Sequence, residues 1–305
     1  MQLVADIGGT NARLAAVGSE GHLAHLKSAK NAAYDSFEGV LSDYLDGLGT
    51  AAPKGLVVAV AGPVSDGVGR LTNLPWVVDQ RKIKDRFGCA TEVINDLTAL
   101  GYAALGLHDD QLIDVDDAAP ESSHRQALVV GIGTGFNVSS VIDVQGRLVC
   151  PTAEAGHASL PSRVTRALDD LKPGISKAFN TVESLFAGQG RRRFLSEVTG
   201  RTVESATPLI AAVGRPGNEA NDAALDAYAR LIGHLLLDLK LNYMPGQGIF
   251  LAGGVARSSL IAHRAGLCRD VLNVPDQFLP TPVPVRIIND DAAALAGCLK
   301  FANLI

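Results

Sequence analysis

Aromatic residues, cysteines and long apolar runs are scarce in this chain. Aromatic side chains make up 5% of the 305 residues, with a single tryptophan, and there are four cysteines. No segment offers the roughly eighteen unbroken apolar residues of a membrane-spanning helix. The residues that follow Met1, Gln2-Leu3-Val4-Ala5-Asp6, lack the basic and apolar regions of a signal peptide. We therefore expect a soluble, cytoplasmic protein with no membrane partner.

An excess of basic residues is also missing. Lys and Arg number 27 against 32 Asp and Glu, which gives a formal net charge of -5 at pH 7. Such a balance offers no broad electrostatic footprint for a phosphodiester backbone, so no nucleic-acid partner is expected. The one dense basic run, Arg191-Arg192-Arg193, is interpreted as a solvated helix face.

The few cysteines are widely separated, at Cys89, Cys150, Cys268 and Cys298. They form no C-x-x-C pair and have no histidine at zinc-finger spacing, so a structural zinc site is not expected. We interpret them as free thiols in the core of a protein from a reducing compartment.

What the chain does contain is enough apolar sequence for a large core. Hydrophobic residues make up 47% and charged residues only 19%. This composition is typical of a compact globular protein, and 305 residues predict about two domains.

Two similar strand, glycine turn, strand units lie more than a hundred residues apart. Leu3-Val4-Ala5 leads through Gly8-Gly9-Thr10-Asn11 into a second apolar strand at 13–17. The same order returns at 127–130, where a glycine turn leads into a strand at 137–142. This repetition predicts two hairpins that begin two related halves facing each other across a cleft.

Strands and helices alternate through the remainder, which predicts an α/β fold. Residues 56–61 and 92–94 read as buried strands, and helices are expected at 97–107 and 290–302. Leu225, Tyr228, Ile232, Leu235 and Leu239 repeat at spacings of three and four, which indicates an amphipathic helix.

A domain boundary is expected near the acidic, turn-rich segment 109–123. We predict a small α/β domain formed by residues 1–108 together with 290–305. Residues 109–289 are expected to form the large α/β domain.

The glycine turns suit phosphate binding, because a chain without β-carbons lets phosphates approach backbone N–H groups and permits positive φ. Gly8, Gly9 and Thr10 form one such turn, and Gly133, Thr134 and Gly135 form the other. Asp6, just before the first turn, is a candidate ligand for hydrated Mg²⁺. Tight hairpins also need glycine, so each turn alone has two readings. Neither matches a Walker A or dinucleotide-binding motif.

Several polar residues stand at the ends of predicted elements. They are Asn95, Asp96, Glu154, His157 and Glu183. Asp96 is either a functional carboxylate or a helix cap, His157 is a ligand or an ordinary loop histidine, and Glu183 is a ligand or a helix N-terminal carboxylate. Spacing alone does not separate these readings.

The order of motifs resembles bacterial ATP-dependent glucokinase, within the actin-like sugar kinase superfamily and on its zinc-free glucokinase branch. The resemblance covers essentially the whole chain and is carried by Asp6-Ile7-Gly8-Gly9-Thr10-Asn11-Ala12-Arg13, Leu71-Thr72-Asn73-Leu74-Pro75-Trp76, Ile94-Asn95-Asp96, Gly133-Thr134-Gly135, Glu154-Ala155-Gly156-His157 and Leu251-Ala252-Gly253-Gly254. It implies two actin-like (ribonuclease H-like) α/β domains flanking an ATP cleft, and a homodimer.

The same resemblance implies ATP-dependent phosphorylation of glucose to glucose 6-phosphate, with ATP and Mg²⁺ required. Asp96 is then the general base for the 6-hydroxyl, and Asn95, Glu154, His157 and Glu183 bind other sugar hydroxyls. Both glycine turns then bind the phosphates, and Gly253 and Gly254 lie near the nucleoside. Thr72 and Asn73 support the loop that contacts the sugar.

Some positions depart from the usual glucokinase pattern. Phe136-Asn137 stands where Leu-Gly is common, and Ala153 and Ala155 flank Glu154 where glycines are common. The segment around Glu183 also differs. These changes leave sugar preference open, so the alternatives are a kinase for another hexose or amino sugar, or a sugar-binding regulator without catalysis.

Overall fold

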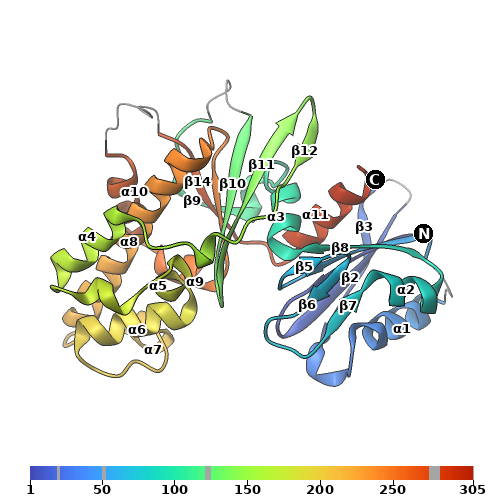
Figure 1. The fold of residues 1–305 in the computed structure, drawn as a ribbon, viewed down its shortest axis with the longest axis horizontal. Helices are drawn as coiled ribbons and strands as arrows, with labels where there is room; N and C mark the ends of the chain where they lie inside the picture. Colours follow the sequence, from blue (N-terminus) through green and yellow to red (C-terminus); the bar gives the residue numbers. More distant parts are fainter. Residues whose placement is uncertain (19–20, 50–52, 121–124, 275–281, 305) are drawn as a thin grey trace. The chain divides into compact units, whose positions relative to one another are not determined.

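The chain folds into two compact units, seen in the computed structural model of Figure 1. The structure describes residues 1–18, 21–49, 53–120, 125–274 and 282–304. The first unit holds Met1–Leu107, Gln145–Cys150 and Asp290–Ile305, and the second holds His108–Val144 and Pro151–Asn289. The grouping of residues 145–150 with the first unit is a feature that the sequence pattern did not indicate.

The first unit is built on a sheet with the order β3-β2-β1-β4-β8. β1 and β2 form an antiparallel hairpin, β4 lies parallel to β1, and β8 lies parallel to β4. In chain order its elements are β1 (Gln2–Ile7), β2 (Asn11–Val17), β3 (Leu23–Lys30), η1 (Asn31–Ala33), α1 (Phe37–Leu48), β4 (Gly55–Val60), β5 (Val64–Ser65), β6 (Val68–Arg70), β7 (Val77–Asp79), α2 (Gln80–Phe87), β8 (Ala90–Asn95), α3 (Asp96–Ala104), β12 (Arg147–Val149) and α11 (Ala293–Ala302).

Both faces of this sheet are covered by helices. Side chains alternate across a strand, so Leu3 of β1 packs with Phe37 of α1, in one apolar cluster, while Val4 packs with Leu295 of α11, in another. Burial on both faces explains why the central strands are continuously apolar in sequence.

The second unit repeats the arrangement of the first. The strands of this unit have the order β11-β10-β13-β14-β9 within a six-stranded sheet, with an antiparallel β10–β11 hairpin, with β13 parallel to β10 and with β14 parallel to β13. In chain order its elements are η2 (Asp109–Gln111), β9 (Leu112–Asp116), β10 (Gln126–Ile132), β11 (Phe136–Val144), η3 (Ala155–His157), α4 (Ser162–Leu171), η4 (Ile175–Ala178), α5 (Val182–Phe186), α6 (Gly188–Thr199), α7 (Thr207–Ala211), α8 (Glu219–Tyr243), β13 (Ile249–Ala252), α9 (Gly254–Ser259), α10 (His263–Leu272) and β14 (Val285–Ile288).

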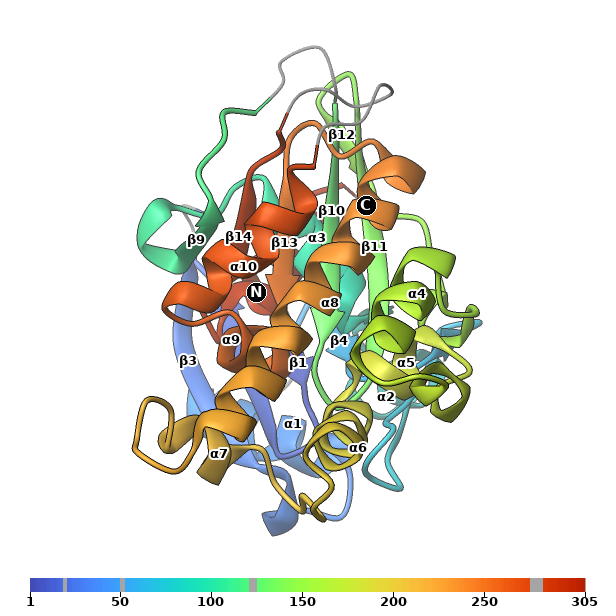
Figure 2. The same ribbon diagram turned by 90° about the vertical axis from the view of Figure 1, so that its left-hand side faces the viewer.

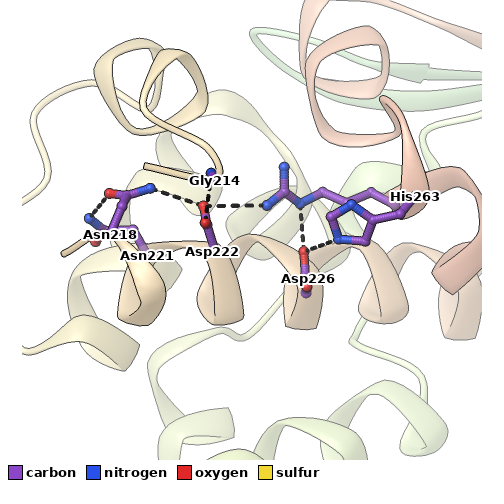
Figure 3. A network of polar contacts seen from close by, with 7 residues as sticks. Gly214, Asn218, Asn221, Asp222, Asp226 and His263 are labelled. Carbon is purple, nitrogen blue, oxygen red and sulfur yellow. Dashed lines mark hydrogen bonds and ion pairs between the residues drawn. The ribbon is translucent and has the colours of Figure 1, made fainter. Parts of the chain in front are cut away.

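The amphipathic helix predicted around Leu225 to Leu239 is α8, and it packs beside α10 on the second unit's sheet (Figure 2). All five residues of its predicted apolar stripe are buried in that unit's core. Asp222 and Asp226 of α8 form hydrogen bonds and ion pairs with residues of α10 and of the loop that precedes α8 (Figure 3). At the centre of these contacts the guanidinium of Arg264, only 2% exposed, donates to Asp226 Oδ1 at 2.8 Å.

Several sequence expectations differ from the structure at element ends. α3 covers Asp96–Ala104 instead of 97–107. α11 begins at Ala293 instead of 290, because Asp290 accepts the N–H of Ala292 in a turn ahead of the helix. The acidic segment 109–123 contains β9, which pairs with β14, and its residues 121–123 lie outside the described part.

The four cysteines are buried free thiols, which confirms the interpretation made from their spacing. Among the described residues, none of the helices is both long and apolar enough to cross a membrane.

Candidate functional site

In the first unit, the ends of three parallel strands bring the N-terminal turn and the Asn95-Asp96 pair to one edge of the sheet. Ile7 of β1 is paired with Val60 of β4, and Val60 is paired with Asn95 of β8. In α/β sheets, ligands bind outside the carboxyl ends of such strands. The register therefore accounts for how residues almost ninety positions apart meet at one edge.

The turn that carries Gly8, Gly9 and Thr10 is held by Asn31. Gly8 N–H donates to Asn11 O at 3.0 Å within the hairpin. Asn31 then donates its side-chain amide to Gly8 O at 2.8 Å and its backbone N–H to Thr10 O at 2.9 Å. Asn31 is 2% exposed, whereas Gly9 and Thr10 are exposed. Asn31 thus fixes the backbone of the turn, while Gly9 and Thr10 remain accessible to solvent.

The glycines of both predicted phosphate turns are not required by backbone conformation. Positive φ values occur at other glycines but at none of Gly8, Gly9, Gly133 and Gly135, so positive φ is not the reason for glycine in these turns. A β-carbon on Gly9 would meet Asn73 Nδ2 at 3.4 Å, an ordinary contact. The protein alone has room for alanine at Gly9, which leaves close approach of a ligand as the remaining reason for glycine.

Asp6 is a buried carboxylate paired with Arg13. Its exposed fraction is 8%, and Arg13 Nη1 donates to its Oδ2 at 3.3 Å. Arg13 Nη2 also lies 3.6 Å from Asp291 Oδ2. Burial raises the pKa of Asp6 to about 6, and the charge of Arg13 opposes part of that rise. A desolvated carboxylate of this kind gains from a further cation.

A single carboxylate suits Mg²⁺, which usually keeps several waters and takes one or two protein carboxylates together with substrate phosphates. Asp6 fits that requirement. It would hold the ion beside the Gly8–Thr10 turn, where the ion would neutralise charge on phosphate oxygens.

Asp96 was interpreted as either a functional carboxylate or a helix cap, and the structure assigns the cap mainly to its neighbour Asn95. Asn95 is the N-cap of α3, because its Oδ1 accepts the N–H groups of Leu97 and Thr98 at 2.9 and 3.3 Å. Its Nδ2 donates to Gly62 O at 2.9 Å. The capping function therefore belongs mainly to Asn95, although Asp96 Oδ1 also accepts from Leu97 N–H at 2.9 Å.

Asp96 is half-buried at the start of α3. Burial raises the pKa of its carboxyl group to about 7, repulsion from Asp6 adds to the rise, and the hydrogen bond from Leu97 N–H opposes it. A carboxylate with a pKa close to neutral is suited to accept a proton at physiological pH.

In the second unit, three glycine-containing segments converge on the turn after β10. Gly133 N–H donates to Gly135 O at 3.0 Å, and Gly188 N–H donates to Gly133 O at 2.8 Å. Gly253 has φ +97° and lies against Ile132, whose carbonyl oxygen would stand 2.5 Å from an added β-carbon. Thr134, Gly135 and Gly254 are exposed. The predicted phosphate and nucleoside glycines of this unit are therefore neighbours.

The predicted sugar residues of the second unit gather around the start of β11. Glu183, half-buried in the first turn of α5, accepts the N–H of Phe136 at its Oε2, 2.9 Å away. Gly156 lies between Phe136 and Glu183, where an added β-carbon would collide with the Phe136 carbonyl. Glu154 and His157, at the two ends of this segment, are exposed. Glu183 is thus both a helix N-terminal carboxylate and part of the cluster.

Sequence reasoning assigned no role to two residues that touch these clusters. The side chain of Asn137 bonds the segment that carries Glu154. Arg191 was grouped with a solvated basic face, which is wrong for this residue, because its Nη1 donates to Ser258 Oγ at 2.7 Å and Ser259 Oγ at 3.0 Å. Arg192 and Arg193 are exposed.

A glucokinase family model matches residues 3–304. The chain belongs to the glucokinase family. The glucokinase of Brucella melitensis is 30% identical over 99% of this chain and 90% of that relative. The glucokinase of Saccharophagus degradans is 30% identical over 83% of this chain and 82% of its own length.

Solved structures agree with this membership. A glucokinase from an Antarctic psychrotroph matches with a TM-score of 0.83 and 25% identity, covering 100% of this chain and 99% of that one. A ROK family glucokinase from Streptomyces griseus, in complex with glucose and AMPPNP, matches with a TM-score of 0.65 and 18% identity, covering 100% and 99%. At that identity the likeness concerns the fold.

These matches confirm three predictions made from the sequence, which are the glucokinase family, a fold of two actin-like α/β domains and a glucokinase enzyme.

Proposed function

We propose that this chain transfers the γ-phosphoryl group of ATP to the 6-hydroxyl of glucose, with Asp96 as the general base. The observation that carries the proposal is the state of Asp96. It is a half-buried carboxylate at the edge shared with the Gly8–Thr10 turn, and burial raises its pKa to about 7. The complex of the Streptomyces griseus glucokinase with glucose and AMPPNP supports the choice of substrates.

An alcohol is a poor nucleophile, so its proton must leave as phosphoryl transfer proceeds. Asp96 accepts the proton of the 6-hydroxyl while the bond between that oxygen and the γ-phosphorus forms and the bond to the β-phosphate oxygen breaks. The products are glucose 6-phosphate, ADP and a protonated Asp96. Asp6 would hold a hydrated Mg²⁺ ion, and the bound ion would compensate for negative charge on the phosphates.

The remaining groups bind and orient. Backbone N–H groups of the turns Gly8–Thr10 and Gly133–Gly135 donate hydrogen bonds to phosphate oxygens, and Gly253 and Gly254 lie against the nucleoside. Asn95, Glu154, His157 and Glu183 bind sugar hydroxyls. Carboxylates, an amide and an imidazole together provide the donors and acceptors that a neutral polyol needs. Thr72 and Asn73 support the loop that contacts the sugar.

The test is Asp96→Asn, assayed by coupled kinetics over a panel of hexoses and by calorimetry of glucose binding. The amide keeps the shape of the carboxylate but does not take up the proton, so turnover should fall roughly 10² to 10⁴-fold, while the glucose Kd changes little. Asp85→Asn, an exposed carboxylate of α2, is the matched control and should keep wild-type turnover. Turnover of Asp96→Asn within threefold of the wild type would exclude Asp96 as the base.

We also propose a cytoplasmic homodimer. Four buried free thiols suit a reducing compartment. Light scattering on the purified protein should give twice the chain mass of 31.8 kDa, and a mass of one chain would reject the dimer.

A further inference from the structure

Asn137, the second residue of β11, ties down the segment that carries Glu154. Its Nδ2 donates to Ala153 O at 2.6 Å, and its Oδ1 accepts the N–H of Ala155 at 3.0 Å. One side-chain amide therefore bonds the residues on both sides of Glu154. The same Nδ2 lies 3.3 Å from Glu154 Oε2 and donates to it.

The orientation of this amide follows from its surroundings. Val138 N–H donates to Asn137 Oδ1 at 2.8 Å, in addition to the N–H of Ala155. Two donors facing one end and a carbonyl facing the other allow only one assignment of the oxygen and the nitrogen. The nitrogen must therefore point toward Ala153 and the carboxylate of Glu154.

Asn137 also reduces the conformational freedom that Glu154 must lose when a ligand binds. Ala153 and Ala155 are partly buried and pack against the apolar core of the second unit, whereas Glu154 is exposed. A free glutamate side chain loses rotamer entropy when it is ordered. A carboxylate already held by a hydrogen bond on Oε2, on a segment fixed at both sides, avoids part of that loss when a ligand binds.

We propose that Asn137 is a positioning residue that orients the Glu154 carboxylate for the sugar and sets how strictly hexoses are distinguished at the hydroxyl which Glu154 contacts. The inference rests on the proposed function, in which Glu154 is a sugar ligand. Asn137 acts through Glu154 and does not itself touch the reacting atoms. Because it orders one sugar ligand, its removal weakens sugar binding and leaves the nucleotide and the chemical step unaffected.

The sharpest variant is Asn137→Asp, which has nearly the same shape. The introduced carboxylate still accepts the N–H groups of Val138 and Ala155, but it has no hydrogen to donate to Ala153 O or Glu154, and its charge repels the Glu154 carboxylate. We expect the glucose KM to rise tenfold or more, with kcat and the ATP KM within about threefold of the wild type. The ratio of kcat/KM between glucose and its single-hydroxyl epimers (mannose, allose and galactose) should fall for at least one of them.

A double-mutant cycle with Glu154→Ala separates positioning from a general effect on folding. If Asn137 acts through Glu154, adding Asn137→Asp to Glu154→Ala should raise the glucose KM no further. Ser139→Ala, a buried hydroxyl two residues along the same strand, is the control and should leave all kinetic constants unchanged. Thermal unfolding of each variant monitors the fold. If Asn137→Asp does not fold, Asn137→Ala carries the same expectations.

The outcomes distinguish the inference from the function on which it rests. A raised glucose KM in both single variants without additivity supports the inference. If Glu154→Ala raises the glucose KM but Asn137→Asp does not, or if the two effects add in full, the positioning role is overturned and the function of Glu154 stands. If Glu154→Ala leaves the glucose KM unchanged, the sugar-binding role of Glu154 fails, and the inference fails with it.

Discussion

The carboxyl groups of Asp6 and Asp96 interact electrostatically, and this coupling bears on the proposed role of Asp96 as a base. Burial and repulsion from Asp6 both favour the protonated form of Asp96 and raise its pKa to about 7. Only the deprotonated form accepts a proton from a sugar hydroxyl. The same burial that raises the basicity of the Asp96 carboxylate therefore limits the pH range in which it could serve as the proposed base.

We predict that kcat/KM for glucose falls about tenfold per pH unit below an apparent pKa near 7. Asp6→Asn should move the pKa of Asp96 downward, because the repulsion is removed. The first expectation is checked by initial rates between pH 5.5 and 8.5, and the second by carbon NMR titration of the Asp96 carboxyl group in the free protein, which does not depend on activity. An Asp96 pKa near 4 in the wild type would contradict both expectations.

Gly9 tests whether the first turn is shaped for a phosphate. We predict that Gly9→Ala raises the ATP KM about tenfold, equivalent to about 1.4 kcal/mol, and leaves the melting temperature nearly unchanged. The melting temperature should not change because the nearest neighbour of an added β-carbon, Asn73 Nδ2, lies at 3.4 Å. The KM should rise because the same β-carbon would obstruct the approach of a phosphate to the backbone.

Gly47→Ala is the matched control for Gly9→Ala. Gly47 is exposed within α1 and has nothing within 4 Å of an added β-carbon. Alanine should stabilise that helix by up to about 1 kcal/mol and leave the ATP KM unchanged. Equal ATP constants for Gly9→Ala and the wild type would remove the phosphate role of this turn.

At the scale of elements, Arg191 joins α6 to the segment that follows β13. Its Nη1 donates to Ser258 Oγ, and Ser258 Oγ in turn donates to Gly254 O at 2.6 Å. Burial lowers the pKa of Arg191. A half-buried guanidinium on α6 thus fixes α9 and, through Ser258, the carbonyl of Gly254, a residue proposed to contact the nucleoside.

We predict that Arg191→Met weakens ATP binding several-fold without changing the glucose KM, because α9 and Gly254 lose their connection to α6. Methionine fills much of the volume of the arginine stem, so the core of the second unit is largely preserved. Calorimetric titration with ATP and with glucose measures the two affinities separately. Arg192→Gln, an exposed neighbour on the same helix, should affect neither ligand. A parallel loss of both affinities would indicate a general loss of structure instead.

Local patterns predicted some elements well and others poorly. The two glycine-turn hairpins and the apolar stripe of α8 are short-range patterns, and the structure confirms them. β9 is different, because its residues are mostly acidic or half-exposed and it forms only by pairing with β14, some 170 positions away. A strand stabilised by a distant partner at a sheet edge leaves little periodicity in its own sequence.

The same limit applies to the candidate site. The carboxylates and glycine turns stand out in the sequence because their residue types suggest chemistry. Asn31, Asn137 and Arg191 act by holding those groups. Their contacts join residues 16 to 68 positions apart for Asn137 and Arg191, and 23 positions apart for the side chain of Asn31. Their residue types suggest nothing without the fold, so sequence reasoning did not select them.

At the scale of the whole molecule, the buried carboxylates make stability depend on pH. The pKa values of Asp6 and Asp96 in the folded protein, about 6 and about 7, lie above the ordinary value of 3.8. The folded state therefore holds protons that the unfolded state releases. The contribution of these groups to the free energy of unfolding is fully present below about pH 4 and is lost as the pH rises through 6 and 7.

Other groups act in the opposite direction. Burial lowers the pKa of His234 in the second unit, so its contribution to stability grows as the pH rises through the ordinary histidine range. The difference between the wild type and a single variant is therefore more informative than either curve alone. Asp96→Asn removes one titrating carboxyl group and leaves His234 in place.

We predict that Asp96→Asn and the wild type have similar free energies of unfolding near pH 5 and that the variant becomes the more stable one above pH 7, by about 1 kcal/mol or more, since one pKa unit corresponds to about 1.4 kcal/mol. The amide is never ionised, so it avoids the desolvation that the wild-type carboxylate meets once it loses its proton. Urea unfolding of both proteins at several pH values between 5 and 8.5 measures the difference, with Asp85→Asn as a surface control expected to show none. A difference that is constant across this range, or one that favours the wild type at alkaline pH, would show that Asp96 is ionised in the folded protein throughout and would remove the physical basis for its role as a base near neutral pH.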